Sequence, residues 1–334
     1  MPTTSSPQKH ILHFRDSLVF VGSIALSALI AMQFVSLRSA IIWTSFSVLS
    51  TYSLYNAKPD RSNIFDILFW MIIISASTFL GVFFHLTWKI YLFLFLISYF
   101  YYYLFGKDPV TDRAMRFIIV LTTIGTAMPD ITVGLPIGSA IGTFSALLVC
   151  HFLQWKNKDL SAFKQGIFTH DLFKLQTNII PRSLIYSLGM SLSLWLPHYL
   201  GIEKNYWATI TFVMVMTPKA TTVIQNTWKR FWGSIFAIVF LFALFQIPHY
   251  VHVDMEWFML AMLLIFSFIL PLCFGQNFTL VTFGVTCYSL VLVEIAMFWT
   301  HPMMGILGDR IIETVIGGTI AIITSWILRA LRYN

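Results

Sequence analysis

Residues 206–233 read YWATITFVMVMTPKATTVIQNTWKRFWG. A short apolar segment, a proline break and a basic pair stand side by side here, in a chain that is otherwise almost without charge. Lys219, Lys229 and Arg230 flank apolar residues on both sides. Because a charged side chain is costly in hydrocarbon, the stretch must lie at a membrane surface or carry a charge into the membrane.

The composition of the whole chain indicates a membrane protein. Its 334 residues are 57% hydrophobic and 10% charged, whereas soluble domains carry roughly a quarter charged residues. A membrane-spanning helix needs about 20 apolar residues, and the breaks at charged residues, proline and glycine leave space for about twelve such helices. We therefore predict an all-α polytopic membrane protein, with no room for a soluble catalytic domain.

The predicted spans are bounded by charged, proline and glycine clusters. They run roughly over residues 14–35, 40–56, 64–86, 88–105, 115–129, 133–154, 183–200, 206–218, 229–247, 255–272, 277–297 and 306–328. The segment 206–218 is too short to cross a bilayer alone, so we expect it to be broken or to line a cavity. Residues 156–181 carry apolar residues at helical spacing between charges, which predicts an amphipathic cytoplasmic linker.

The basic residues divide unequally between the two sides of this map. With the N-terminus in the cytoplasm, 17 of the 21 lysines and arginines fall on the inner side. Basic residues favour the cytoplasmic side of a membrane protein, so we expect both termini there. The net charge of +7 then reflects orientation, and we infer no nucleic-acid partner from it.

The two halves of the chain resemble each other, which predicts an internal repeat. Trp43 and Trp207 each precede alternating hydroxyl residues, and each half closes with a glycine-containing segment around Gly142 or Gly317. Six spans per half predict two parallel six-helix repeats, residues 1–155 and 182–334, joined by the linker 156–181. A binding site between the repeats would lie on the axis that relates them.

The tryptophan register also pairs two charges. Aligning Trp43 with Trp207 places Asp66 opposite Arg230. We expect these side chains to face one another near the inner end of a transport pathway.

The second half carries motifs of a known superfamily. They are Tyr206-Trp207-Ala208 with Thr211 and Pro218, Arg230-x-x-Gly233, and Arg310-x-x-Glu313-Thr314-x-x-Gly317. This half resembles the fusaric-acid-resistance-like superfamily, which includes the aromatic acid exporters; the first half resembles it only in the Trp43 segment and the layout of spans. The resemblance implies a bacterial inner-membrane efflux protein for organic acids that works beside a periplasmic adaptor of the membrane-fusion type. The chain lacks the large cytoplasmic domain of the longer members.

The basic pair Lys229 and Arg230 has two interpretations. Long side chains at a span terminus commonly reach for the lipid headgroups. Arg230 also matches the superfamily motif and precedes Gly233 by three residues, which would let its guanidinium reach a carboxylate ligand bidentately. The predicted substrate-binding or pathway residues are Arg230, Lys229, Trp207, Thr211, Trp43, Asp66, Arg310 and Glu313.

Three acidic residues near the outer side have different expected roles. Asp309 and Glu313 lie one turn apart with Arg310 between them, so the three charges could simply neutralise one another. We favour a pathway or gating role for Arg310 and Glu313, because charges inside a membrane usually face a cavity. Glu294 has no basic residue nearby in its span, which makes it the proton-coupling candidate, with plain proximity to water as the other reading.

Prolines mark two predicted gates or hinges. Pro129 and Asp130 lie in a polar, proline-broken outer hairpin, and Pro218 breaks the stretch quoted above. The glycines after the hairpin recur every four residues, which predicts close helix packing.

No metal site or cofactor is predicted. The three cysteines lack CxxC spacing, and His249-x-x-His252-x-Asp254 lies in a short loop with no helix to fix its geometry. We find no nucleotide-binding or hydrolase motif, so neither enzymatic activity nor ATP-driven transport is expected.

The leading interpretation is a secondary exporter of small organic anions, with aromatic carboxylic acids as the favoured substrates. An anion channel is the alternative within transport. A non-transporting scaffold or a membrane-embedded enzyme is the alternative outside it. Beyond the substrate, the lipid bilayer and the adaptor, a second copy of the chain is a possible partner.

Overall fold

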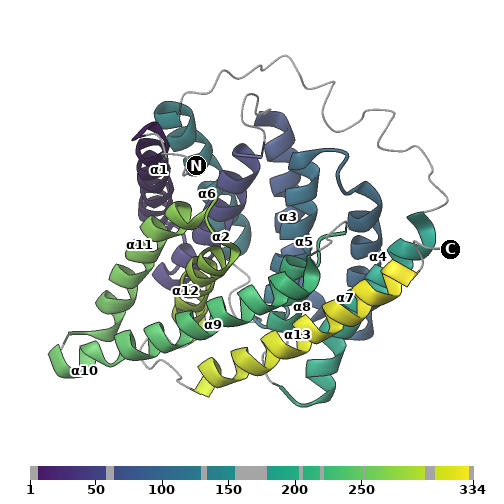
Figure 1. Ribbon diagram of the computed structural model, residues 1–334. Helices are drawn as coiled ribbons and strands as arrows, with labels where there is room; N and C mark the ends of the chain where they lie inside the picture. Colours follow the sequence, from purple (N-terminus) through teal and green to yellow (C-terminus); the bar gives the residue numbers. More distant parts are fainter. Residues whose placement is uncertain are drawn as a thin grey trace. The chain divides into compact units, whose positions relative to one another are not determined.

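The computed structural model describes residues 7–57, 64–128, 134–154, 179–202, 206–218, 222–251, 253–297 and 305–330, and these form α-helices with no β-strand (Figure 1). The all-helical prediction is therefore confirmed. In chain order the helices are α1 (Pro7–Ala31), α2 (Leu37–Tyr55), α3 (Ile64–Phe84), α4 (Trp88–Leu104), α5 (Pro109–Gly125), α6 (Gly134–Gln154), α7 (Ile180–Tyr199), α8 (Tyr206–Val215), α9 (Val223–Phe245), α10 (Ile247–Val251), α11 (Met255–Cys273), α12 (Phe278–Met297) and α13 (Gly305–Ala330).

Every predicted span coincides with a helix. Within the described residues, seven helices, α1, α3, α6, α9, α11, α12 and α13, are long and apolar enough to cross a membrane, and α4 and α8 are apolar but shorter. Large apolar side chains such as Phe236, Val239 and Phe242 on α9 are exposed, as expected where lipid replaces water. The chain is a multi-pass membrane protein; that twelve helices cross the membrane remains a prediction.

Helices α1, α5 and α9 begin six or seven residues earlier than predicted. The Asp108 side chain caps α5 by accepting the Thr111 N–H at 2.9 Å, and Pro109 occupies the first turn, where a missing N–H costs nothing. Helix α9 begins at Val223 rather than at residue 229. Arg230 therefore lies in the third turn of α9 instead of at its start. The predicted linker 156–181 lies outside the described residues except for its last three.

The chain divides into two compact units that each combine segments from both halves of the sequence. Unit 1 comprises residues 1–52, 133–157 and 235–304. In it α1 packs against α6 and α11, and α11 packs against α12. Helix α12 also contacts α2, where the Tyr288 hydroxyl donates to the Ser45 carbonyl at 3.2 Å.

The glycines of α6 allow close packing on α2 within unit 1. A Cβ added at Gly138 would lie 2.7 Å from the Trp43 Cβ, and one at Gly142 would lie 2.8 Å from the Thr44 carbonyl oxygen. Only glycine permits this approach, which confirms the predicted role of these residues in helix packing.

Unit 2 comprises residues 53–132, 158–234 and 305–334. Its helices pack in the pairs α3 with α5, α4 with α5 and α7, and α13 with α7. Helix α8 contacts α5, α7 and α13, and its residues are buried except for the partly exposed Met214. This short helix forms the core of unit 2, and it is the first part of the segment 206–233.

Candidate functional site

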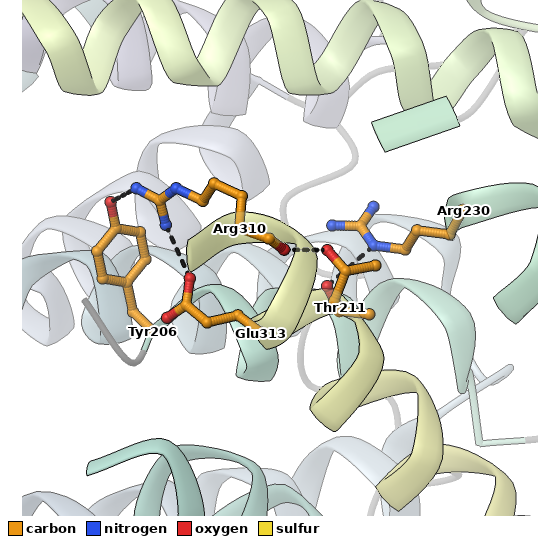
Figure 2. Close-up of polar contacts among 6 residues, drawn as sticks. Tyr206, Thr211, Arg230, Arg310 and Glu313 are labelled. Atoms are coloured by element: carbon orange, nitrogen blue, oxygen red, sulfur yellow. Dashed lines mark hydrogen bonds and ion pairs between the residues drawn. The ribbon is translucent and has the colours of Figure 1, made fainter. Parts of the chain in front are cut away.

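Arg310 on α13 lies against the start of α8 (Figure 2). Its Nη2 donates a hydrogen bond of 2.7 Å to the Tyr206 hydroxyl, and its Nη1 lies 3.3 Å from Oε2 of Glu313. The guanidinium also lies over the rings of Tyr206 and Trp207, at 4.9 and 4.6 Å from their centroids, which adds a cation–π attraction. The side chains of Arg310 and Glu313 are both fully buried, so this pair is neutralised internally.

Arg230 on α9 reaches α8 one turn further along (Figure 2). Its Nε donates to the Thr211 hydroxyl at 3.2 Å, and only 1% of the residue is exposed. Its Nη1 and Nη2 are buried and have no hydrogen-bond partner among the described residues. The part of the structure that is described thus gives the Arg230 guanidinium a neutral hydroxyl and no carboxylate.

Ser234 extends the donor set of Arg230. It follows Arg230 by one helical turn, so both side chains lie on the same face of α9. Ser234 is 1% exposed, and its hydroxyl has no hydrogen-bond partner among the described residues. Two guanidinium nitrogens and a hydroxyl that all can donate are the groups that an oxyanion requires.

The surroundings of Arg310 and Arg230 differ in energy, because a buried cation is unfavourable without a counter-charge. The effective penalty for removing an ion from water is several kcal/mol. Arg310 recovers part of that cost through Glu313, whereas the contacts of Arg230 within the described residues recover it only through one neutral hydrogen bond. The site around Arg230 is therefore chemically suited to bind an anion.

The predicted site residues fall into different units. Trp207, Thr211, Arg230, Arg310 and Glu313 come together around α8 in unit 2. Asp66 is buried in the first turn of α3 in the same unit, and Lys229 is partly exposed beside Arg230.

Two further predicted residues belong to unit 1. Trp43 is buried against α6, and Glu294 is buried on α12. Of the predicted gate and hinge residues, Pro218 is buried just beyond α8, whereas Pro129 and Asp130 lie outside the described residues.

Asp66 and Arg230, which were expected to face one another, form no ion pair with each other in the described part of the structure. Both side chains are buried, but the hydrogen bond of Arg230 goes to Thr211. Whether the two residues line one pathway remains a prediction.

Tyr206 and Ser234 were missed as site residues by sequence reasoning. Tyr206 precedes Trp207 inside the superfamily motif, and its place in the motif could have identified it as a site residue. Ser234 follows Arg230 at the four-residue spacing of one helix face. That spacing was available within the predicted span 229–247, but the expected position of Arg230 near the headgroups gave no reason to use it.

The motif His249-x-x-His252-x-Asp254, considered for a metal, is not tested by the described geometry. Among the described residues, no group of three or more His, Cys, Asp or Glu side chains could hold a metal ion. The side chains of His249 and His252 lie outside the described set.

Fold and site together define a multi-pass helical membrane protein in which Arg230, Arg310 and Glu313 lie around one short buried helix. Residues 191–324 match the family described as fusaric acid resistance protein-like. The resemblance inferred from the motifs is thereby confirmed for this segment, which contains α8, Arg230, Arg310 and Glu313. No curated protein and no solved structure matches the chain. The matched family is one of membrane transport and efflux proteins.

Proposed function

We propose that this protein is a secondary exporter of small organic anions in a bacterial inner membrane, with aromatic carboxylates as its substrates. The observation that carries the proposal is the buried Arg230, whose terminal nitrogens have no partner among the described residues. A planar guanidinium binds a carboxylate through two parallel hydrogen bonds. Thr211 fixes the Nε edge of the group, so the Nη edge is left for the substrate.

The membrane potential supplies a driving force for export. Moving a monovalent anion out of a negative-inside cell gains about 2.3 kcal/mol per 100 mV, which corresponds to about fiftyfold accumulation outside. Coupling to protons is therefore not required, but Glu294 stays our candidate for it. Uniport, proton antiport and channel flow differ in saturation and in response to a pH gradient.

The contacts within the two units support the predicted repeat. By serial position in each half, α1, α2, α4, α5 and α6 correspond to α7, α8, α11, α12 and α13. The contacts of α1 with α6 and α11 then correspond to those of α7 with α13 and α4. The contact of α2 with α12 likewise corresponds to that of α8 with α5.

One residue-level contact recurs as well. A Cβ at Gly142 would meet the Thr44 carbonyl, and a Cβ at Gly317 would meet the Ala208 carbonyl. Thr44 and Ala208 each directly follow the tryptophan that sets the repeat register. These agreements favour two parallel six-helix repeats that exchange helices between two units.

The test is flux of radiolabelled 4-hydroxybenzoate in proteoliposomes, with an imposed potential and with or without a pH gradient. We expect saturable export that Arg230→Gln abolishes, because the substitution removes the charge but keeps a polar side chain. Arg182→Gln is the matched control, since Arg182 on α7 is partly exposed and is not one of the predicted site residues, and we expect it to retain most of the flux. Normal flux in Arg230→Gln would remove Arg230 from the pathway.

The same assay separates the competing functions. Flux that rises linearly with substrate concentration and does not change with the pH gradient would identify an anion channel. A scaffold would show no flux and would copurify with a partner. Copurification of a periplasmic adaptor together with measured flux would support the expected exporter assembly, and cross-linking would show whether the chain forms a homo-oligomer.

A further inference from the structure

A third arginine belongs to the surroundings of α8. Arg310 contacts the start of this helix at Tyr206, and Arg230 contacts its middle at Thr211. Near its end, a chain of aromatic contacts leads to Arg116 on α5. Ten residues of α-helix span about 15 Å, so the three guanidinium groups lie at different levels along one short helix.

The Arg116 side chain forms a hydrogen bond through one of its terminal nitrogens. Its Nη2 lies 3.5 Å from the Tyr101 hydroxyl, a long hydrogen bond. Its Nε is buried and has no hydrogen-bond partner among the described residues. Asp112, one turn earlier on α5, accepts the Gly106 N–H with both carboxylate oxygens, at 2.9 and 3.0 Å.

Three tyrosines surround this arginine and connect it to α8. The ring of Tyr186 on α7 lies 6.0 Å from that of Tyr101 and 5.3 Å from that of Tyr102, both on α4. Tyr186 also lies 5.4 Å from the Phe212 ring on α8. Its hydroxyl donates to the Met216 carbonyl just beyond the end of α8, at 3.1 Å.

We propose that Arg116, Tyr101, Tyr102 and Tyr186 form a second binding site, which takes an aromatic carboxylate before it reaches Arg230. The guanidinium binds the carboxylate, and the tyrosines provide ring edges and faces for the aromatic part. The inference rests on the proposed function, because it concerns the same substrate. It adds a place where the aromatic ring is recognised, which the surroundings of Arg230 do not explain.

The position of this site along α8 gives it a role in the transport sequence. On the orientation predicted from the basic residues, Arg116 lies on the cytoplasmic side and Arg310 on the outer side. The second site is then the loading site, and Arg230 is the next position along the helix. Unlike Arg310, neither Arg116 nor Arg230 forms an ion pair among the described residues. Asp112 attracts Arg116 from one turn away without pairing with it, so the Nε of Arg116 and the terminal nitrogens of Arg230 are left to bind a mobile anion.

Equilibrium binding of radiolabelled 4-hydroxybenzoate to the purified full-length protein in nanodiscs tests the proposal. We expect the wild type to bind one molecule at Arg116 and one at Arg230. Arg116→Gln should remove one of them and leave the other, as should Arg230→Gln. The matched control is Arg182→Gln, which changes a partly exposed arginine on α7 and should leave both.

Cyclohexanecarboxylate, which has the charge without the aromatic ring, tests recognition of the ring. We expect it to compete at Arg230 in the Arg116→Gln protein and to compete poorly at Arg116 in the Arg230→Gln protein. If Arg116→Gln does not fold, Arg116→Lys keeps the charge but loses the planar fork, and it should weaken the second site about tenfold.

The outcomes separate this inference from the proposed function. One bound molecule in the wild type that is lost with Arg230→Gln and kept with Arg116→Gln would overturn the second site and leave the exporter proposal standing. No binding to the wild type at all would overturn both. Equal competition by cyclohexanecarboxylate at the two sites would overturn the role of the tyrosines.

Discussion

At the scale of residues, two fully buried arginines on different helices have different surroundings. Arg310 has an acidic partner, a tyrosine hydroxyl and two aromatic rings around it. Arg230 has one threonine hydroxyl within the described residues. The first arrangement stabilises the contact between α13 and α8, whereas the second is suited to exchange ligands.

The Arg310–Glu313 pair yields a stability prediction. Glu313→Gln should destabilise the protein by about 3–5 kcal/mol, because it leaves a buried guanidinium without its counter-charge. Replacing both residues together, as Arg310→Met with Glu313→Leu, should cost less, since no unpaired charge remains. Unfolding in mixed micelles by SDS titration measures both free energies.

Glu256→Gln serves as the control for this comparison, because Glu256 is exposed on α11 and its substitution should change little. If Glu313→Gln is no more destabilising than Glu256→Gln, the buried pair does not stabilise the fold. A greater loss in the double variant than in Glu313→Gln would also contradict the argument from the unpaired charge.

At the scale of elements, α8 ends at Val215, three residues before Pro218, and nearly all of it is buried. Its neighbours approach it closely through glycine. A Cβ at Gly189 of α7 would lie 3.0 Å from the Phe212 ring, and one at Gly317 of α13 would meet the Ala208 backbone. Helix α8 therefore keeps Thr211 and Tyr206 in place for the two arginines by being tightly enclosed.

Gly317→Ala tests this enclosure. The added methyl group meets a backbone carbonyl that cannot rotate away, so α13 and α8 must separate, at a cost of about 1–3 kcal/mol. Because Arg310 is carried by α13, transport should fall together with stability. Gly308→Ala on the same helix is the control, since a Cβ there meets nothing within 4 Å. Equal stability and flux in the two variants would contradict the role of this contact.

At the scale of the whole molecule, neither half of the sequence forms a unit alone. Unit 1 takes α1, α2 and α6 from the first half and α11 and α12 from the second, and unit 2 takes α3, α4 and α5 from the first half and α7, α8 and α13 from the second. Helix α9 is divided between the two units. Contacts between the halves, such as those of α1 with α11 and of α4 with α7, thus contribute to the packing of each unit.

This exchange predicts the behaviour of a split protein. Residues 1–155 and 182–334 expressed together should copurify and export 4-hydroxybenzoate, whereas either piece expressed alone should fail to accumulate, because each lacks the helices that cover its apolar faces. Affinity purification through a tag on one piece, followed by the flux assay, measures this. Stable, monodisperse accumulation of a single half would contradict the exchange, and the intact chain with a protease site in the linker is the control.

Much of the fold could be predicted from the sequence because the bilayer imposes simple rules. Apolar runs of sufficient length must become helices, since unpaired backbone groups are not tolerated in hydrocarbon. The short segment 206–218 was expected to be unusual for the same reason, and α8 is a buried helix of ten residues. Boundaries such as the start of α9 were less accurate, because charged residues that mark a membrane surface can also lie inside a helix.

The sequence by itself determined that the chain is a helical membrane protein, that residues 206–233 are its unusual segment, and that Arg230, Arg310 and Glu313 are candidate site residues. Only the tertiary structure decided the partners of Arg230 and Arg116. Arg310 meets Glu313 one turn away on its own helix, a pairing that local spacing encodes. The contacts of Arg230 with Thr211, and of Arg116 with Tyr101, join different helices. They depend on how those helices pack, and a linear pattern of residues does not specify such contacts.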